Sequence, residues 1–247
     1  MVAAAPARGP LARRTMSTTF HHRVPRDDLG CGVVRAEPVA VGPAPEALAE
    51  ALAAWRARRR DAPLDAETEQ RRLRSRDMLR NGRYKPTGRG KPANEYLLRA
   101  AAGDDFPLIN GPVDANNVVS LQYMVPISVW DLDLAGSDSF EVRLGAADEA
   151  YVFNPSGQTL ALADLVCGCA LAEGGSRPLV TPIKDGMVTK IQPGTTRVAG
   201  LIYFPLRAGG EEVLAAATAE LARWLGSCGE GVDVRWATLL PGAEVSI

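Results

Sequence analysis

Residues 108–133 read LINGPVDANNVVSLQYMVPISVWDLD, and the pattern of this stretch changes at Pro126. Residues 113–126 predict a short helix that stops before Pro126, because the residue before a proline avoids the helical region. Residues 127–133 predict a strand, since this short segment carries Ile and Val and is bounded by Pro and Asp. The stretch therefore joins a helix to the first of several expected strands.

The segments before this stretch predict helices. Residues 43–60, PAPEALAEALAAWRARRR, consist mostly of strong helix formers. Asp65 can cap a second helix over residues 65–80, whose acidic side chains come first and whose Arg residues follow, an order that suits the helix dipole. Gly82 is expected to end that helix with a left-handed cap. A third helix is expected over residues 92–103, opened by its proline.

The segments after it predict a sheet closed by a final helix. Short segments rich in Val, Ile and Thr, separated by turn residues, are expected to be strands at 127–133, 139–144, 150–153, 165–171, 178–183, 186–191, 196–205 and 232–237. Residues 211–226 predict the last helix. The fold class is therefore α+β, with a mixed sheet core and helices in the N-terminal third and near the C-terminus. We expect a disordered leader at 1–20, a helical extension at 21–80 and a sheet-containing domain at 81–247.

The 247 residues carry a net charge of −1, but the charge is unevenly distributed. Between Arg71 and Arg99, ten Lys or Arg residues face two acids, a local net charge of +8. Between Ala100 and Ala170, ten acids face one base, a local net charge of −9. The neutral total therefore conceals a strongly polar chain. With 46% hydrophobic residues, the chain can bury a substantial core as one large domain or two small ones.

Several catalytic and metal-binding classes lack the residues they need. The two histidines, His21 and His22, lie near the expected disordered leader, so a histidine base is not expected. Cys167 and Cys169 are too close together for the usual zinc spacing and are expected to be buried core residues. Gly90-Lys91 is followed by proline rather than Ser or Thr, which excludes a Walker loop. We therefore expect no metal and no cofactor.

No apolar run is long enough to span a membrane, and the N-terminal residues lack the apolar core of a secretory signal. A cytoplasmic protein is the expectation. The first fifteen residues are interpreted as a disordered leader or as an over-extended start before Met16.

The twelve residues NGRYKPTGRGKP at 81–92 combine three Gly, two Pro and four cations. Glycines allow backbone N–H groups to approach an anion closely, and an aromatic ring within a cationic groove suits single-stranded nucleic acid. The RNA-binding candidates are Arg83, Tyr84, Lys85, Arg89 and Lys91. The alternative is a solvated charged face.

Residues 108–119 and 125–133 resemble the core of the editing region, or B3/B4 domain, of the bacterial phenylalanyl-tRNA synthetase beta subunit. The family has a similar pattern of Ile-Asn, Val-Asp and Asn-Tyr-Val, followed by proline and then Phe-Asp-Leu-Asp; this chain has Asn-Asn-Val and Trp-Asp-Leu-Asp at the last two places. The segment YKPTGRGKP at 84–92 resembles a signature of stand-alone relatives. The resemblance covers about residues 81–205, and the aminoacylation motifs of the synthetase are absent.

The resemblance implies a domain that hydrolyses the ester of a mischarged tRNA. This chemistry needs a positioned water and preorganised donors for the oxyanion, and no histidine base. Asn116 and Asn117 match polar positions of the family helix and are catalytic candidates together with Ser128. Helix capping is the alternative explanation of the two asparagines.

The chain departs from the family pattern at two positions. Ser128 stands where the family has histidine, and residues 197–203 lack the family's tyrosine-recognising glutamate, so tyrosine specificity is not implied. In the segment 184–190, Asp185 is a candidate for binding a substrate ammonium, and Gly186, Thr189 and Lys190 complete the expected substrate site. A tight Asp-Gly turn is the alternative.

The sequence therefore predicts a tRNA-binding, editing-like domain that hydrolyses mischarged aminoacyl-tRNA in trans. The alternatives are a non-catalytic RNA-binding module and a binder of a free amino acid or related small molecule. The expected partner is tRNA or aminoacyl-tRNA, with no DNA and no membrane, and the sequence leaves the oligomeric state open.

Overall fold

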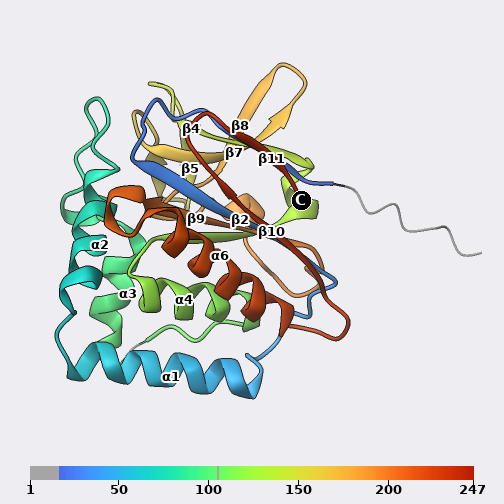
Figure 1. The fold of residues 1–247 in the computed structure, drawn as a ribbon. Coiled ribbons are helices and arrows are strands. Elements are labelled where there is room, and N and C mark those ends of the chain that lie inside the picture. The colour runs from blue at the N-terminus through green and yellow to red at the C-terminus, as the bar shows by residue number, and fades with distance from the viewer. Residues whose placement is uncertain (1–16, 105) are drawn as a thin grey trace, which may run out of the picture.

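The computed structural model describes residues 17–104 and 106–247 (Figure 1). Along the chain the elements are β1 (Thr19–His22), β2 (Leu29–Glu37), α1 (Glu46–Asp61), α2 (Ala66–Asp77), η1 (Gly88–Gly90), α3 (Ala93–Ala101), α4 (Gly111–Tyr123), β3 (Ile127–Asp131), α5 (Leu132–Ala135), β4 (Ser139–Leu144), β5 (Ala150–Val152), β6 (Thr159–Ala161), β7 (Val166–Ala172), β8 (Gly175–Val180), η2 (Met187–Thr189), β9 (Val198–Pro205), η3 (Leu206–Ala208), α6 (Gly210–Gly226), β10 (Asp233–Leu239) and β11 (Glu244–Ser246). The fold class is a mixed α+β fold, as the sequence predicts.

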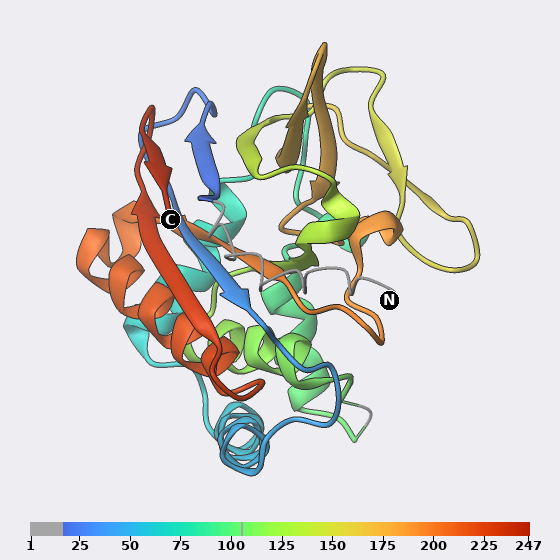
Figure 2. The same cartoon turned by 90° about the vertical axis from the view of Figure 1, so that its right-hand side faces the viewer.

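The elements form three layers (Figures 1 and 2). Helices α4 and α6 cover one face of an antiparallel four-stranded sheet with the order β10-β2-β9-β3, and α1 packs against α4 on the side away from the sheet. A mixed five-stranded sheet with the order β11-β1-β4-β7-β8 covers the other face. A separate hairpin, β5–β6, projects from this side of the molecule. The four-stranded sheet is therefore the middle layer.

Strands of the middle layer are apolar on both faces because each face meets a different layer. Successive side chains of a strand point to opposite faces. Val33, Leu201 and Tyr203 pack toward the five-stranded sheet, whereas Val34, Ile202 and Phe204 pack toward the helices. This explains the unbroken apolar run VAGLIYFP of β9, which reads as a buried strand without alternation.

Helix α4, which carries the two candidate asparagines, is fixed at both ends. Its N-cap is Asn110, whose Oδ1 accepts a hydrogen bond from the backbone N–H of Val113 at 3.1 Å. At its other end, the buried Arg59 of α1 donates to the carbonyl oxygens of Leu121 and Gln122 at 2.8 and 2.9 Å. These donors satisfy carbonyls that a helix end leaves without partners.

Helix α6 lies unusually close to the middle sheet at Gly32 of β2. A Cβ atom at Gly32 would lie 2.1 Å from Oγ1 of the buried Thr218. The hydroxyl of Thr218 donates to the carbonyl oxygen of Leu214 at 2.7 Å, which holds the side chain in this position. Glycine is therefore required at residue 32 by packing.

The strands β1 and β11 bring the two ends of the described chain together. Thr19 pairs with Ser246, and β1 pairs in parallel with β4 on its other side. The backbones of Thr18 and Ile247 exchange two hydrogen bonds, at 2.8 and 3.0 Å. Because β1 and β4 pair in parallel while the other strand pairs of this sheet are antiparallel, the five-stranded sheet is mixed.

The expected helices at 43–60, 65–80, 92–103, 113–126 and 211–226 are confirmed as α1, α2, α3, α4 and α6, with shifted ends. Asp65 caps α2 as predicted, accepting from the backbone N–H of Thr68 at 2.8 Å. Gly82 has the expected positive φ, but α2 ends earlier, at Asp77. The strand expected at 186–191 was wrong, because this segment forms the short turn η2.

The N-terminal part of the chain also differs from expectation. Most of the expected disordered leader, residues 1–16, lies outside the described residues, but residues 19–22 form β1. Residues 29–37, expected within a helical extension, form β2 in the middle sheet. His22 is consequently buried in β1, and burial lowers its pKa. Residues on both sides of the boundary expected at residue 80 contribute to each core cluster.

Cys167 and Cys169 are fully buried in β7 within the core between the two sheets, which confirms the core interpretation. Burial raises the pKa of both thiols. Within the described ranges, none of the helices has the length and apolar character needed to cross a membrane.

Candidate functional site

The loop from Arg83 to Lys91 connects α2 to α3 and contains the turn η1. Gly82 and Gly88 both have positive φ, which allows the chain to reverse twice within a few residues. The hydroxyl of Tyr84 donates to the carbonyl oxygen of Gly90 at 3.0 Å and closes the loop. The half-buried ring of Tyr84 packs against the core between the sheets. Tyr84 therefore has a structural role that its expected stacking role did not include.

Most of the ten cations counted between Arg71 and Arg99 are already paired within the protein. Six form ion pairs with the acids Glu67, Glu69, Asp77, Glu95 and Asp164: these are Arg71, Arg72, Arg74, Arg76, Arg80 and Arg83. Arg99 stacks on the ring of Tyr96. Across residues 17–104 and 106–247, no ion pair involves Lys85, Arg89 or Lys91. The cationic surface is therefore smaller than the sequence predicts and centres on the loop.

A pocket of about 720 Å³ lies between this loop and the β5–β6 hairpin, and we name it the cationic pocket. Tyr84, Lys85 and Arg89 line it from the loop, and Phe153 and Lys184 line it from the opposite side. The amino group of Lys184 lies 4.0 Å from the centre of the Phe153 ring, a cation–π contact. Three cations and two aromatic rings thus surround one hollow.

The turn that follows Lys184 borders the same hairpin. Lys190 is exposed, and its amino group donates to the carbonyl oxygen of Phe153 at 2.9 Å. Thr189 is buried, and Gly186 is packed so that a Cβ would lie 2.8 Å from the carbonyl oxygen of Leu179. Of this expected substrate group, Lys190 is the residue whose side chain faces solvent.

Ser128 and Asp185 are brought together, as their assignment to one site requires. The hydroxyl of Ser128, on β3, donates to Asp185 Oδ1 at 2.7 Å, and the backbone N–H of Thr181 donates to the same oxygen at 3.3 Å. The hydroxyls of Ser128 and Tyr203 lie 3.4 Å apart. Tyr203 belongs to the β9 segment in which the sequence lacks the family glutamate, so a phenol group stands near Ser128 instead.

The surroundings of Asp185 disfavour its charged form. Burial raises the pKa of its carboxyl group to about 7, while the hydrogen bonds from Ser128 and Thr181 act in the opposite direction. Ser128 itself is 1% exposed. The pair is thus a hydroxyl–carboxyl hydrogen bond between a buried Ser128 and a part-buried Asp185, the contact that a nucleophile and its base would require.

Asn116 and Asn117 lie in α4, apart from the Ser128–Asp185 pair. Asn116 donates to Asn117 Oδ1 at 3.2 Å, and Asn117 is buried. Ser128 pairs with Leu201, which faces the five-stranded sheet, whereas α4 packs on the opposite face of the middle sheet. Capping does not explain the two asparagines, because the cap of α4 is Asn110.

Sequence reasoning did not assign Phe153 or Lys184 to a site, although Lys184 begins the segment 184–190. Lys85 and Lys184 are far apart in the chain, and the fold brings them to one pocket. The backbone N–H of Ala93, just after the loop, donates to the carbonyl oxygen of Pro182 at 2.8 Å and holds the two segments together. No local pattern in the sequence signals this pairing.

No family model matches the chain, and no curated protein matches it. Among solved structures, it is similar to an N-terminal fragment of the phenylalanyl-tRNA synthetase beta subunit from Pyrococcus horikoshii, with 12% sequence identity and a TM-score of 0.43. The match covers 55% of this chain and 44% of that one, so this chain spans less than half the length of that structure.

Proposed function

We propose that the protein binds the single-stranded acceptor end of a tRNA at the cationic pocket. The observation that carries this proposal is the meeting of Lys85, Arg89 and Lys184 around one hollow that also presents the ring of Phe153. Cations attract the phosphates, and an aromatic ring offers a stacking surface to any base. Because Lys85 and Arg89 form no ion pair in the described ranges, binding a phosphate breaks no existing pair there.

Neutralising the loop is expected to weaken RNA binding and its salt dependence. In the variant carrying Lys85→Ala, Arg89→Ala and Lys91→Ala, we expect affinity for an uncharged tRNA to fall about tenfold to a hundredfold at low salt. The plot of log affinity against log salt has a negative slope. This slope should become shallower by about 2 in the variant, since each of three lost phosphate contacts on a single strand contributes about 0.7 to its steepness. Fluorescence anisotropy over a salt series measures both quantities.

The matched control removes the same charge elsewhere. Arg74, Arg80 and Arg223 are partly exposed and already ion-paired, so their triple replacement by Ala should leave the affinity close to that of the unmodified protein. An equal loss of affinity in both triple variants would mean that net charge alone governs binding. An unchanged affinity in the loop variant would rule out the cationic pocket.

The second candidate function is hydrolysis of the aminoacyl ester of a bound tRNA, favoured by the contact between Ser128 and Asp185. A general base works best when its pKa lies near the working pH, and the pKa of Asp185 is about 7. In this role the ionised Asp185 accepts a proton from a water or from Ser128 as its oxygen attacks the ester carbonyl. The bond from the carbonyl carbon to the ribose oxygen then breaks, and the proton passes to that oxygen. If Ser128 attacks, water hydrolyses the aminoacyl ester of Ser128 in a second step. Ser128 is 1% exposed, so an ester reaches it only when the side chains that cover it move.

The test of hydrolysis is release of amino acid from a panel of mischarged and correctly charged tRNAs. We expect selective release from one mischarged species, with a rate that rises through about pH 7 as Asp185 ionises. Ser128→Ala and Asp185→Asn should each lower the rate at least a hundredfold, the scale of general-base catalysis. If the protein binds tRNA tightly and in a salt-dependent way but releases no amino acid, it is an RNA-binding module and not a hydrolase.

A further inference from the structure

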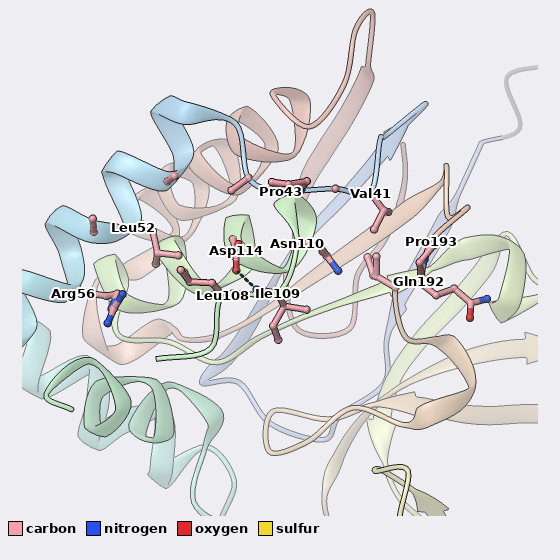
Figure 3. Close-up of a pocket in the computed structure, with 15 residues that line it drawn as sticks. Val41, Pro43, Leu52, Arg56, Leu108, Ile109, Asn110, Asp114, Gln192 and Pro193 are labelled. Atoms are coloured by element: carbon pink, nitrogen blue, oxygen red, sulfur yellow. Dashed lines mark hydrogen bonds between the residues drawn. The ribbon is translucent and has the colours of Figure 1, made fainter. Parts of the chain in front are cut away.

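A second hollow lies on the helical side of the molecule, and we name it the α1 groove (Figure 3). Its volume is about 770 Å³, within the range of small-molecule sites. Its walls are α1, the segment 41–44, the segment 108–114 that leads into α4, and the loop 191–193. None of its lining residues lines the cationic pocket.

The walls of the α1 groove are mostly apolar. Val41, Leu52 and Ile191 contribute to them, as do Leu108 and Ile109. The last two are 66% and 61% exposed, a large exposure for adjacent aliphatic side chains. A ligand with an apolar group would cover them and gain about 25 cal/mol per Å² of apolar surface removed from water.

Asp114 supplies a carboxyl group to this groove and is 3% exposed (Figure 3). In the described ranges of the chain, it accepts one hydrogen bond, from the backbone N–H of Ile109 at 3.2 Å, and forms no ion pair. Burial raises its pKa. A ligand cation beside Asp114 would offset the cost of burying its charge.

Arg56 supplies the opposite charge from α1. Its guanidinium lies 4.6 Å from the centre of the Phe106 ring, and its Nε is enclosed without a hydrogen-bond partner. It forms no ion pair with any of the residues that the structure describes. Arg56 and Asp114 therefore face one groove from different walls, and neither neutralises the other (Figure 3).

We propose that the α1 groove binds a free α-amino acid with an apolar side chain. Its ammonium group pairs with Asp114, its carboxylate pairs with Arg56, and its side chain covers Leu108 and Ile109. Two opposite charges that form no ion pair within residues 17–104 and 106–247, set in an apolar groove, complement a zwitterion better than an acid or an amine alone.

The test compares leucine with two analogues that each lack one charge. N-acetyl-leucine has no ammonium group, and leucinamide has no carboxylate. Calorimetric titration of the full-length protein should give at least tenfold tighter binding of leucine than of either analogue, a factor equivalent to about 1.4 kcal/mol for each lost ion pair. Isoleucine, methionine and phenylalanine extend the panel.

Two variants test whether Asp114 binds the ammonium group of the ligand and whether Arg56 binds its carboxylate. Asp114→Asn keeps an acceptor for Ile109 and should abolish the preference for leucine over N-acetyl-leucine. Arg56→Gln should abolish the preference for leucine over leucinamide. The loop variant at residues 85, 89 and 91 is the matched control and should bind leucine unchanged, so this proposal and the tRNA proposal stand or fall separately.

Three outcomes would overturn the proposal. The first is no binding of any amino acid of the panel up to about 10 mM, which corresponds to less than about 3 kcal/mol of binding free energy. The second is equal binding of leucine and both analogues, which indicates an apolar groove without charge recognition. The third is unchanged preference in both variants.

Discussion

Replacing Asp185 by Asn is expected to stabilise the protein at about pH 8 and to leave its stability nearly unchanged at about pH 4. Asp185 is part-buried, its carboxyl group accepts a hydrogen bond from the buried Ser128, and burial raises its pKa to about 7. Asparagine has nearly the same shape and keeps an oxygen that can accept from Ser128 and Thr181. It removes the charge that the protein buries at neutral and higher pH.

The direction follows from proton binding in the two states. The unfolded protein loses the proton of Asp185 near pH 4, whereas the folded protein keeps it until about pH 7. Below pH 4 the carboxyl group of Asp185 is protonated in both states, so its burial as a charge does not reduce the free energy of unfolding. Between pH 4 and pH 7 the folded state binds more protons at Asp185 than the unfolded state does. The free energy of unfolding therefore falls as the pH rises through this range. Above pH 7 the loss is complete, on the order of a few kcal/mol.

Urea denaturation of both proteins across this pH range measures the effect. The difference in unfolding free energy between variant and unmodified protein should be near zero at low pH and grow to a few kcal/mol at high pH. Asp148→Asn is the control, because Asp148 is exposed and its replacement should change stability by less than about 0.5 kcal/mol. A difference that stays flat with pH would mean that Asp185 titrates normally.

The second large effect is expected at Gly32, where β2 passes α6. Gly32→Ala should destabilise the protein by about 3 kcal/mol or more, because the new Cβ would overlap Oγ1 of Thr218. The overlap cannot be relieved easily by a shift of β2, which is hydrogen-bonded to β10 and β9, or of Thr218, which is fully buried. Thermal or denaturant unfolding provides the measurement.

A double variant tests the cause. Thr218→Ala removes Oγ1, the atom that a Cβ at residue 32 would overlap, and leaves a distance of 3.1 Å between the two Cβ atoms. The loss of stability in the Gly32→Ala, Thr218→Ala double variant should therefore be smaller than the sum of the two single losses, by about 1 kcal/mol or more. Gly42→Ala is the control, because a Cβ at Gly42 meets no atom within 4 Å. Strict additivity would show that the loss at Gly32 has another origin.

The parts of the fold that the sequence predicts well are those whose signals are local. The helix-forming residues of α1, the capping aspartate of α2 and the proline before α3 each act within a few positions, and these helices form where expected. β2 was missed because its residues LGCGVVRAE include two glycines, which weaken a strand pattern. Gly32 is there because α6 approaches the sheet, and this tertiary cause has no local signal.

The candidate site shows the same division between local and long-range signals. The loop at 83–91 is predicted from its composition, and four of the arginines before it pair with acids of α2 or its end at helical spacing, a local pattern. The pairing of Arg76 with Glu95 and of Arg83 with Asp164 depends on acids from other elements and has no local signal. The contact between Ser128 and Asp185 joins two residues that the resemblance assigned to one site. Phe153 and Lys184 were not assigned to the RNA surface, because tertiary structure alone brings them to the loop.

The pairing of β1 with β11 has a consequence for how this unit can be joined to other chains. Thr18 and Ile247 are hydrogen-bonded neighbours, so a host protein could lead into the unit and continue from it at almost the same point. A loop of the host could therefore carry the whole fold as an insert with little change in its own path. By the same geometry, a short peptide bridge between these residues would close the chain into a ring, and new ends could be opened at an exposed turn such as residues 155–158.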